Sequence, residues 1–293
     1  MPPVLIERPC CWGGEALITS CAKRAWSGRA ARLALSGAGN CSPRAFVCSQ
    51  KFFPDNANAE DFRITCVAII PARGGSKRIP FKNGRAFHGK PMMSWPIATA
   101  RDSGLFSRIV VSTDDAELAE CARLSGAQVP FVRAAGLADD HTGTTEVIRD
   151  AIARLELAPD VLVCCIYPTA AFATSEDLRQ AHQKLVSGNA NWVLTVGEFP
   201  APVDRGYRRT SSGFVPRWPE NMPARSQDLE PMYFDAGQFY WASVATWMQP
   251  GAHVWDGADA VVLPRERCVD IDTEDDWALA ESLFSLQRGK RGI

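Results

Sequence analysis

A basic segment with two adjacent glycines follows the first strongly apolar stretch of the chain. The residues 64–70 are apolar or β-branched, and the segment 71–83, PARGGSKRIPFKN, comes directly after them. Glycine lets backbone amides approach a ligand closely, and successive N–H groups form a concave site for anions. The cations Arg73, Lys77 and Lys82 add positive charge that suits a polyphosphate. The segment therefore predicts a phosphate-binding loop.

This loop matches neither of two familiar phosphate-binding motifs. It has neither the G-x-x-x-x-G-K-S/T spacing of a P-loop nor the G-x-G-x-x-G fingerprint of dinucleotide-binding proteins. An ordinary basic surface turn is the alternative interpretation. Its position after a buried strand favours function, because open α/β sheets bind ligands at the carboxyl ends of their strands.

Two acidic residues near the end of the chain are spaced for metal binding. Asp270 and Asp272 are two residues apart just before the last expected helix, so in an extended segment both side chains face the same way. Their oxygens suit Mg²⁺, which keeps some of its waters and takes further ligands from substrate phosphates. The alternative is that Asp272 and Thr273 only cap the helix. The phosphate loop elsewhere in the chain favours the metal site.

The elements that position these residues alternate between strand and helix, which predicts an α/β sandwich with a mostly parallel sheet. Strands are expected at 64–70, 108–112, 129–133, 161–166, 192–196, 237–241 and 260–263. Helices are expected at 91–103, 114–126, 145–155, 176–186 and 273–287. Within the first helix Pro96 should cause a kink. Asp114 and Glu117 have the spacing of a capping box.

Residues 199–232 interrupt this alternation. They contain six prolines and several charges, and Gly213 is expected in a hairpin turn. A long irregular insertion of this kind usually forms a lid or an interface arm. We therefore expect this segment to lie outside the sandwich.

Composition excludes several classes of protein. The 293 residues are 46% hydrophobic and 22% charged, with 32 basic and 33 acidic side chains, as in soluble globular proteins. A net charge of −1 argues against nucleic acid or an anionic membrane as the main partner. No apolar run is long enough for a membrane-spanning helix. The ten cysteines form no zinc-like pattern, and a reducing cytoplasm suits them.

Residues 1–63 differ from the rest of the chain. They are rich in Gly, Ala, Ser and Arg, and hold a possible short helix at 22–35 and no secretory signal peptide. We interpret them as a leader that is disordered or lies upstream of the true start; an organelle-targeting segment and an ordered extension are the alternatives. The predicted catalytic domain spans 64–293.

From residue 64 onward the sequence resembles the acylneuraminate cytidylyltransferases, also called CMP-sialic acid synthetases. The family pattern A-R-x-G-S-K-x-I-P-x-K-N matches residues 72–83. Further matches lie at 110–115, 137–140 and 270–274. Within the family the chain is most similar to the pseudaminic acid cytidylyltransferases, through the stretches 165–169, 225–230 and 235–241.

The resemblance implies a fold, an activity and residue roles. The fold is a Rossmann-like nucleotide-diphospho-sugar transferase sandwich with a dimerisation insertion at 199–232, which makes a homodimer the expected assembly. Arg73, Lys77 and Lys82 are the expected catalytic residues, and Asp270 and Asp272 the expected Mg²⁺ ligands. The other expected nucleotide-binding residues are Ala72, Gly74, Gly75, Ser76, Asn83, Arg133, Thr142 and Thr144. The expected sugar-binding residues are Tyr167, Arg205, Arg225 and Gln227.

One departure bears on the acceptor sugar. Sialic acid synthetases carry Gln where this chain has Tyr167, before the pair Pro168 and Thr169. An aromatic surface suits a sugar with more methyl and acetamido groups and fewer hydroxyls, such as pseudaminic acid.

The implied reaction transfers CMP from CTP to the anomeric hydroxyl of a nonulosonic acid and releases pyrophosphate. N-acetylneuraminate, legionaminate or another keto sugar acid is the alternative acceptor, and a catalytically silent nucleotide-binding domain is the alternative of another class. The interpretation requires Lys82 and Asp272, 190 positions apart, to face one cleft.

Overall fold

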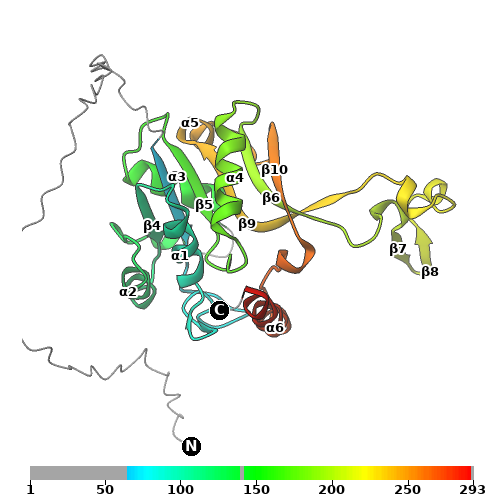
Figure 1. The fold of residues 1–293 in the computed structure, drawn as a ribbon, viewed down its shortest axis with the longest axis horizontal. Coiled ribbons are helices and arrows are strands. Elements are labelled where there is room, and N and C mark those ends of the chain that lie inside the picture. Colours follow the sequence, from blue (N-terminus) through cyan, green and yellow to red (C-terminus); the bar gives the residue numbers. More distant parts are fainter. Residues whose placement is uncertain (1–64, 139–141, 292–293) are drawn as a thin grey trace, which may run out of the picture. The chain divides into compact units, whose positions relative to one another are not determined.

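The computed structural model describes residues 65–138 and 142–291, which belong to one compact unit. Its centre is a six-stranded sheet in the order β10-β6-β9-β5-β1-β4 (Figure 1). The strands are β1 (Cys66–Pro71), β4 (Arg108–Ser112), β5 (Leu162–Ile166), β6 (Trp192–Glu198), β9 (Tyr233–Ser243) and β10 (Ala258–Leu263). The predicted leader and its possible short helix lie outside the described residues.

The sheet is mostly parallel. β1 pairs in parallel with β4 on one side and with β5 on the other, and β10 pairs in parallel with β6. Only β9 runs antiparallel to its neighbours β5 and β6. The predicted α/β sandwich is therefore confirmed. The chain passes from β1 to β4 and then across to β5, so the strand order reverses at β1, where such sheets form a ligand crevice.

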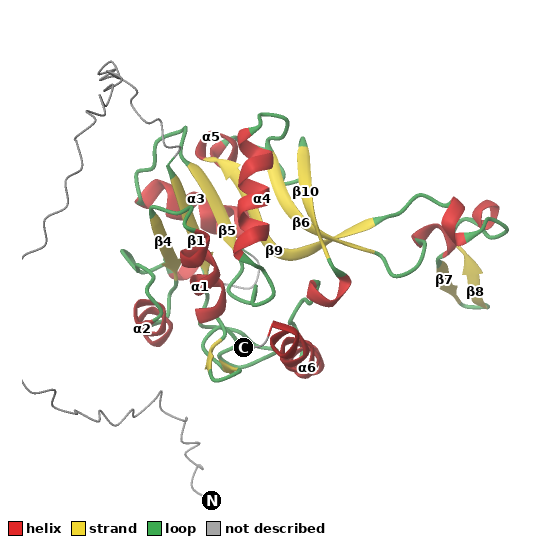
Figure 2. Cartoon of the chain, viewed as in Figure 1, coloured by secondary structure: helices red, strands yellow, loops and turns green. Residues whose placement is uncertain are grey.

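Helices cover both faces of this sheet (Figure 2). They are α1 (Ser94–Ser103), α2 (Ala116–Leu124), α3 (Thr144–Arg154), α4 (Ser175–Val186), α5 (Val244–Met248) and α6 (Glu274–Arg291). In β1 the side chains of Ala68 and Ile70 pack with α1, α2 and α4, whereas Val67 and Ile69 pack with α3 and α5. This alternation explains the continuous apolar run, because a strand buried on both faces needs apolar residues at every position.

Two helix starts differ from the expectation. Asp115, and not Asp114, caps α2, because its carboxylate accepts a hydrogen bond from the Leu118 amide at 2.9 Å. Helix α1 begins at Ser94, later than predicted, so Pro96 lies in its first turn. A proline is tolerated there because the missing N–H would have no partner within the helix, and the predicted kink had assumed an interior position.

The strand predicted at 129–133 is not formed. Only Gln128 and Val132 make isolated bridges, to Val110 and Thr113 of the β4 segment. Pro130 lies between them and has no N–H to donate, which prevents continuous pairing. A small hairpin that the sequence pattern did not indicate, β2 (Ala86–Phe87) with β3 (Lys90–Pro91), follows the basic loop.

The predicted insertion forms an arm that extends away from the sheet beyond β6 and β9 (Figure 1). It carries the hairpin of β7 (Tyr207–Thr210) and β8 (Gly213–Pro216). Gly213 has φ +123° at the hairpin turn, a conformation that favours glycine, as predicted. The described residues also form short 3₁₀ turns at Ala135–Leu137, Val203–Arg205, Pro219–Asn221, Ser226–Asp228 and Arg265–Arg267.

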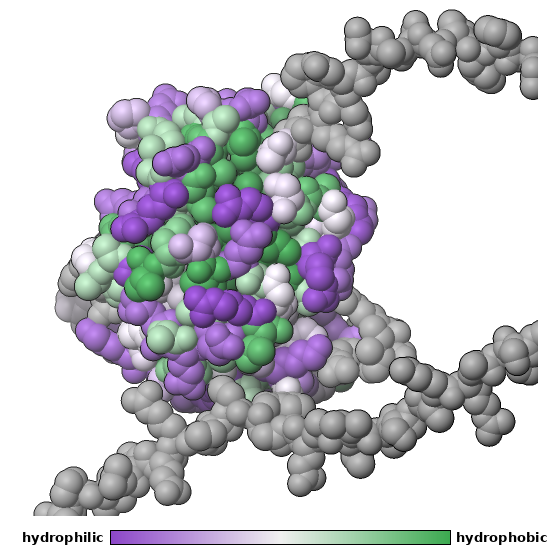
Figure 3. Space-filling view, turned by 90° about the vertical axis from the view of Figure 1, so that its left-hand side faces the viewer, coloured by the Kyte–Doolittle hydropathy of each residue, from purple (hydrophilic) through white to green (hydrophobic). Residues whose placement is uncertain are grey.

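Exposed apolar side chains gather on the arm and its base. They are Phe199, Tyr207, Phe214, Met232 and Tyr233. In contrast, the face seen from the β4 side mixes hydrophilic and hydrophobic residues (Figure 3). Among the described residues, no helix is both long and apolar enough to cross a membrane.

Candidate functional site

A cleft of about 630 Å³ lies where β1 and β5 end, beside the segment that joins β10 to α6. Most of the residues predicted to bind substrate or metal line it. They are Arg73, Ser76, Lys77, Lys82, Asn83, Arg133, Thr142, Thr144, Tyr167, Asp270 and Asp272. Segments from across the chain therefore converge on one cavity, whose lining holds cations of the basic loop, Arg133 and two carboxylates.

The basic loop is fixed against the end of β4. The Gly74 amide donates a hydrogen bond to the Asp114 carboxylate at 3.0 Å, and the Ala72 amide donates to the Ser112 carbonyl at 2.9 Å. A Cβ atom on Gly74 would lie 2.7 Å from the Cβ of Asp115. Glycine is therefore required at 74 by close approach, whereas a Cβ on Gly75 would meet nothing within 4 Å.

Asn83 holds the loop together from inside. Its side chain is 5% exposed, and its amide nitrogen donates to the Arg73 carbonyl at 3.0 Å. Its side-chain oxygen is buried and has no hydrogen-bond partner within the described part of the chain. Such an atom is costly unless a ligand or water satisfies it, and Asn83 lines the cleft.

Lys82 and Asp272 meet in the cleft. The Lys82 ammonium lies 3.2 Å from Asp272 Oδ1 and also donates to the Ile271 carbonyl at 2.5 Å. Arg78 contacts the other carboxylate oxygen of Asp272 at 2.8 Å. The sequence interpretation required Lys82 and Asp272, 190 positions apart, to face one cleft, and the structure meets this requirement.

The second carboxylate, Asp270, is open to the cleft, yet the protein around it displaces water. This desolvation raises the pKa of the Asp270 carboxyl above its ordinary value, and the negative charge of Asp272 raises it further, while Lys82 opposes the shift. Two carboxylates that repel each other are a favourable environment for a cation.

The donor set suits Mg²⁺ better than a metal that needs a full protein cage. Within residues 65–138 and 142–291, no three His, Cys, Asp or Glu side chains cluster to hold a metal. Mg²⁺ needs only one or two carboxylates when water and phosphate oxygens supply the rest. Asp270 and Asp272 fit that requirement, although Asp272 also pairs with Lys82 and Arg78.

Arg133 forms the floor of the cleft at the β4 end. Its side chain is buried and donates to the hydroxyl and the carbonyl of Ser112. Burial lowers the pKa of the Arg133 guanidinium, and the charge of Asp114 opposes this. An arginine stays protonated under such shifts, so Arg133 contributes a fixed positive charge.

Tyr167 lies on the wall formed by the end of β5. Its hydroxyl is 3.2 Å from the Thr144 hydroxyl, and its ring packs edge-on against Tyr240 with centroids 5.6 Å apart. The Tyr240 hydroxyl donates to Asp235 at 2.6 Å. Burial raises the pKa of Tyr167, so the phenol is neutral. The Tyr167 ring, fixed by Tyr240 and Thr144, thus presents an aromatic surface to the cleft.

Three predicted sugar-binding residues lie elsewhere. Arg205, Arg225 and Gln227 are exposed on the arm and do not line the cleft. Arg205 donates to the Ser226 hydroxyl at 3.3 Å, a contact within the arm. The described part of the chain therefore does not bring these three residues to the cleft that the other predicted site residues line.

Sequence reasoning missed the contribution of Asp114. It had been interpreted as a helix cap, but its side chain receives the Gly74 amide and lies near Arg133. Its position at the carboxyl end of a parallel strand was the available signal. Arg78, which pairs with Asp272, was not among the predicted site residues.

Comparisons with known proteins agree with this geometry. A family model described as cytidylyltransferase matches residues 67–204. A pseudaminic acid cytidylyltransferase of Campylobacter jejuni is 38% identical over 223 residues, which are 75% of this chain and 96% of that protein. A CMP-N,N'-diacetyllegionaminic acid synthase of Legionella pneumophila is 32% identical, over 76% of this chain and 97% of that protein.

A solved structure shares the fold. The synthetase of CMP:2-keto-3-deoxy-manno-octonic acid, in complex with CTP, has a TM-score of 0.55 and 14% identity. The match covers 76% of this chain and 99% of that one. At this identity the likeness shows the fold alone.

The two adjacent glycines give a matched test of the loop geometry. Gly74→Ala forces the loop away from Asp115 and should lower the free energy of unfolding by about 1–3 kcal/mol, the usual effect of overpacking. Gly75→Ala should leave it unchanged or slightly raised, because the site is open and the unfolded chain loses freedom. Urea denaturation of both variants measures this. Equal effects at the two positions would contradict the close approach at Gly74.

Proposed function

The chain belongs to the cytidylyltransferase family, and on that premise we propose that it transfers CMP from CTP to the anomeric hydroxyl of pseudaminic acid. Pyrophosphate is the second product. As a member of this family the chain is a nucleotidyltransferase. The nonulosonic acid acceptor is supported by relatives whose names specify pseudaminic and diacetyllegionaminic acid.

The observation that carries this proposal is the meeting of Lys82 with Asp272 in the cleft. A phosphate-binding loop alone suits many nucleotide-binding proteins. Cations opposite a pair of carboxylates form a site for a triphosphate together with a divalent cation, which is what phosphoryl and nucleotidyl transfer require. The unpartnered oxygen of Asn83 adds an acceptor for a nucleotide hydroxyl or amino group.

In the proposed reaction the anomeric oxygen attacks the α-phosphorus in line with the leaving group. The new bond joins that oxygen to phosphorus, and the bond from the α-phosphorus to the oxygen bridging to the β-phosphate breaks. Pyrophosphate leaves with the electron pair, and the hydroxyl proton passes to a base. Asp270 or Asp272, both in the cleft, is a candidate for that base when it is not bound to the cation.

The protein contributes positioning and charge. Arg73, Lys77 and Lys82 line the cleft and would stabilise charge that builds on the leaving pyrophosphate. We propose that Asp270 and Asp272 hold Mg²⁺, which would supply further charge neutralisation of the triphosphate. The support for this ion is the hard oxygen donor pair and its mutual repulsion.

Tyr167 supports pseudaminic acid as the acceptor. Its ring is held by Tyr240 and its hydroxyl by Thr144. It therefore offers the cleft an aromatic face with little freedom to move, which suits methyl and acetamido groups better than hydroxyls. N-acetylneuraminate and legionaminate remain the competing acceptors.

We also propose a homodimer in which the arm packs against a second copy. Apolar side chains of the arm are exposed, and exposed apolar surface of this kind often marks an interface. Phe214→Ser on β8 should weaken self-association by about tenfold or more, while Leu124→Ser on α2 should leave it unchanged. Sedimentation of the full chain measures both, and a monomeric parent chain would contradict the proposal.

The cytoplasm is the proposed location, since Cys164, Cys165 and Cys268 carry free thiols. Such thiols suit a reducing compartment. Cell fractionation tests it.

The function is tested by pyrophosphate release from the full chain with CTP, Mg²⁺ and a panel of sugar acids. The panel contains pseudaminic, diacetyllegionaminic, N-acetylneuraminic and 3-deoxy-manno-octulosonic acids. Pseudaminic acid should give the highest kcat/KM, with the CMP-sugar identified by mass spectrometry. A higher kcat/KM with another acid would contradict pseudaminic acid as the acceptor and identify that acid instead. CTP binding without turnover of any acid would favour a silent nucleotide-binding domain.

Lys82→Ala should lower kcat in this assay by about 10²–10³-fold, because a donor aimed at developing charge is lost. Circular dichroism should show an intact fold. Lys90→Ala is the control, since Lys90 is exposed and its ammonium lies over the Trp95 ring at 5.1 Å. Full activity of Lys82→Ala would remove Lys82 from the phosphate site.

Asp272→Asn should raise the Mg²⁺ concentration needed for half-maximal turnover by about tenfold or more, because a charged ligand is replaced by a neutral one. Asp275→Asn is the control on the exposed first turn of α6. An unchanged Mg²⁺ titration for Asp272→Asn would exclude that residue from the metal site.

A further inference from the structure

The segment 264–273 carries both acidic residues of the cleft but belongs to no strand or long helix. It leaves β10 at one edge of the sheet and ends at α6. Val269 and Ile271 are buried in an apolar cluster with Phe172 and Trp277. Apolar contacts of this kind set how deeply a segment packs but not its position along the surface, so a directional contact is needed as well.

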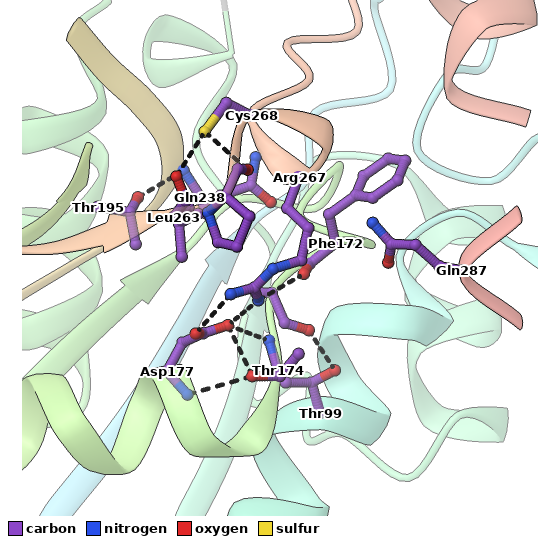
Figure 4. Close-up of polar contacts among 12 residues, drawn as sticks. Thr99, Phe172, Thr174, Asp177, Thr195, Gln238, Leu263, Arg267, Cys268 and Gln287 are labelled. Carbon is purple, nitrogen blue, oxygen red and sulfur yellow. Dashed lines mark hydrogen bonds and ion pairs between the residues drawn. The ribbon is translucent and has the colours of Figure 1, made fainter. Parts of the chain in front are cut away.

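Arg267 supplies a directional contact. Its guanidinium makes a two-pronged pairing with Asp177 of α4, with Nη1 bound to Oδ2 and Nη2 at 3.1 Å from Oδ1. Nη1 also donates to the Phe172 carbonyl at 3.4 Å. Figure 4 shows the Arg267 side chain directed at the start of α4, where these acceptors lie. Paired forks of this type fix orientation as well as distance.

The partner carboxylate is itself held in place. Asp177 accepts hydrogen bonds from the amide of Thr174 at 2.8 Å and from its hydroxyl at 2.6 Å. In return the Thr174 hydroxyl accepts from the Asp177 amide, which completes a capping box at the start of α4. The anchor for Arg267 is therefore a rigid helix end and not a mobile surface side chain.

This helix end is continuous with the opposite wall of the cleft. Pro168 and Thr169 line the cavity after β5, and the chain then passes through Phe172 to Thr174. Arg267 contacts both Phe172 and Asp177, and Asp270 follows three residues later. The pair thus joins the wall that bears Tyr167 to the segment that bears the two carboxylates.

Burial distinguishes this ion pair from the others in the described chain. The side chains of Arg267 and Asp177 are 15% and 8% exposed, respectively. Helix α4 also contacts β10 itself, through Lys184 and Asp259 at 2.8 Å. The side chains of that pair are 33% and 46% exposed, respectively. Exposed pairs hold geometry weakly, whereas a buried and fully hydrogen-bonded pair resists displacement.

We propose that Arg267 and Asp177 are positioning residues that set the placement of Asp270 and Asp272 for binding the divalent cation beside the triphosphate. Neither residue lines the cleft. The pair acts through the backbone of the segment 268–272. This inference rests on the proposed function. It assigns to the pair the task of fixing where the two metal-binding carboxylates lie in the cleft.

The test compares Arg267→Met, Arg267→Lys and Lys184→Met in the full chain. Arg267→Met keeps an apolar stem and loses the fork, Arg267→Lys keeps the charge, and Lys184→Met removes the exposed link at the other end of α4. Mn²⁺ is the probe ion, and its dissociation constant in the presence of CTP is read from the electron paramagnetic resonance signal of free Mn²⁺, corrected with a protein-free titration for the Mn²⁺ that CTP binds. Amide hydrogen exchange reports the segment 268–272, and thermal unfolding reports overall stability.

Arg267→Met should weaken Mn²⁺ binding by about tenfold, the effect typical of residues that orient metal ligands. Exchange within 268–272 should become faster, while CTP affinity without metal stays unchanged. Arg267→Lys should recover part of the loss, and Lys184→Met should match the parent chain. If Arg267→Met folds poorly, the double variant Asp177→Asn with Arg267→Met takes its place, because it avoids an unpaired buried carboxylate. It should show the same loss of Mn²⁺ binding that is expected for Arg267→Met.

A lower unfolding temperature with unchanged Mn²⁺ binding and unchanged exchange in 268–272 would overturn the inference and leave only a structural role. Equal losses in Lys184→Met would overturn it too. If the parent chain turns over no sugar acid, the proposed function fails. The Mn²⁺ comparison with CTP still decides whether the pair positions the carboxylates, so the two failures are distinguishable.

Discussion

The cleft depends on opposite charges that face each other before any substrate is present. Lys82 and Arg78 pair with Asp272, and the Lys82 and Asp272 side chains are 19% and 35% exposed. Pairs with this much access to water stabilise a fold only weakly. They are therefore easily exchanged. In the proposed reaction a triphosphate would take over the cations and a divalent cation would take over the carboxylates, so that charge is matched in both states of the site.

The order of strands in the sheet determines which segments need further contacts to keep the cations and the carboxylates facing each other. The basic loop follows β1 directly and is held by β4 through Asp114 and Ser112. The carboxylates follow β10, which lies at the far edge of the sheet, so their segment must return across the molecule to reach the cleft. A short loop fixed by neighbouring strands needs little further support. The returning segment needs a contact of its own, and Arg267 makes one with the start of α4.

Local patterns predicted much of this fold, and long-range contacts account for what they missed. The apolar run of β1 is a property of a short segment and led to the correct strand. The spacing of Asp270 and Asp272 is local as well, and the structure places both carboxylates at one cleft. The choice between Asp114 and Asp115 as a cap depended on where the Gly74 amide lies, 40 residues away in sequence. The pairing of Arg267 with Asp177 joins residues 90 positions apart, and no local pattern links the two: Asp177 belongs to the capping box of α4, and Arg267 has no local signal that distinguishes it from a surface charge.

The positions of the arm residues connect the assembly to the acceptor site. Arg225 was expected to bind the sugar acid, but in one chain it lies on the exposed arm, outside the cleft. The proposed nucleotide half of the site is assembled within a single chain, since residues of the basic loop, Arg133 and both aspartates line one cavity. A role for Arg225 in acceptor binding therefore requires either a second copy or a large movement of the arm. The exposed apolar residues on that arm favour the second copy, because burying them is what would bring the arm against another molecule.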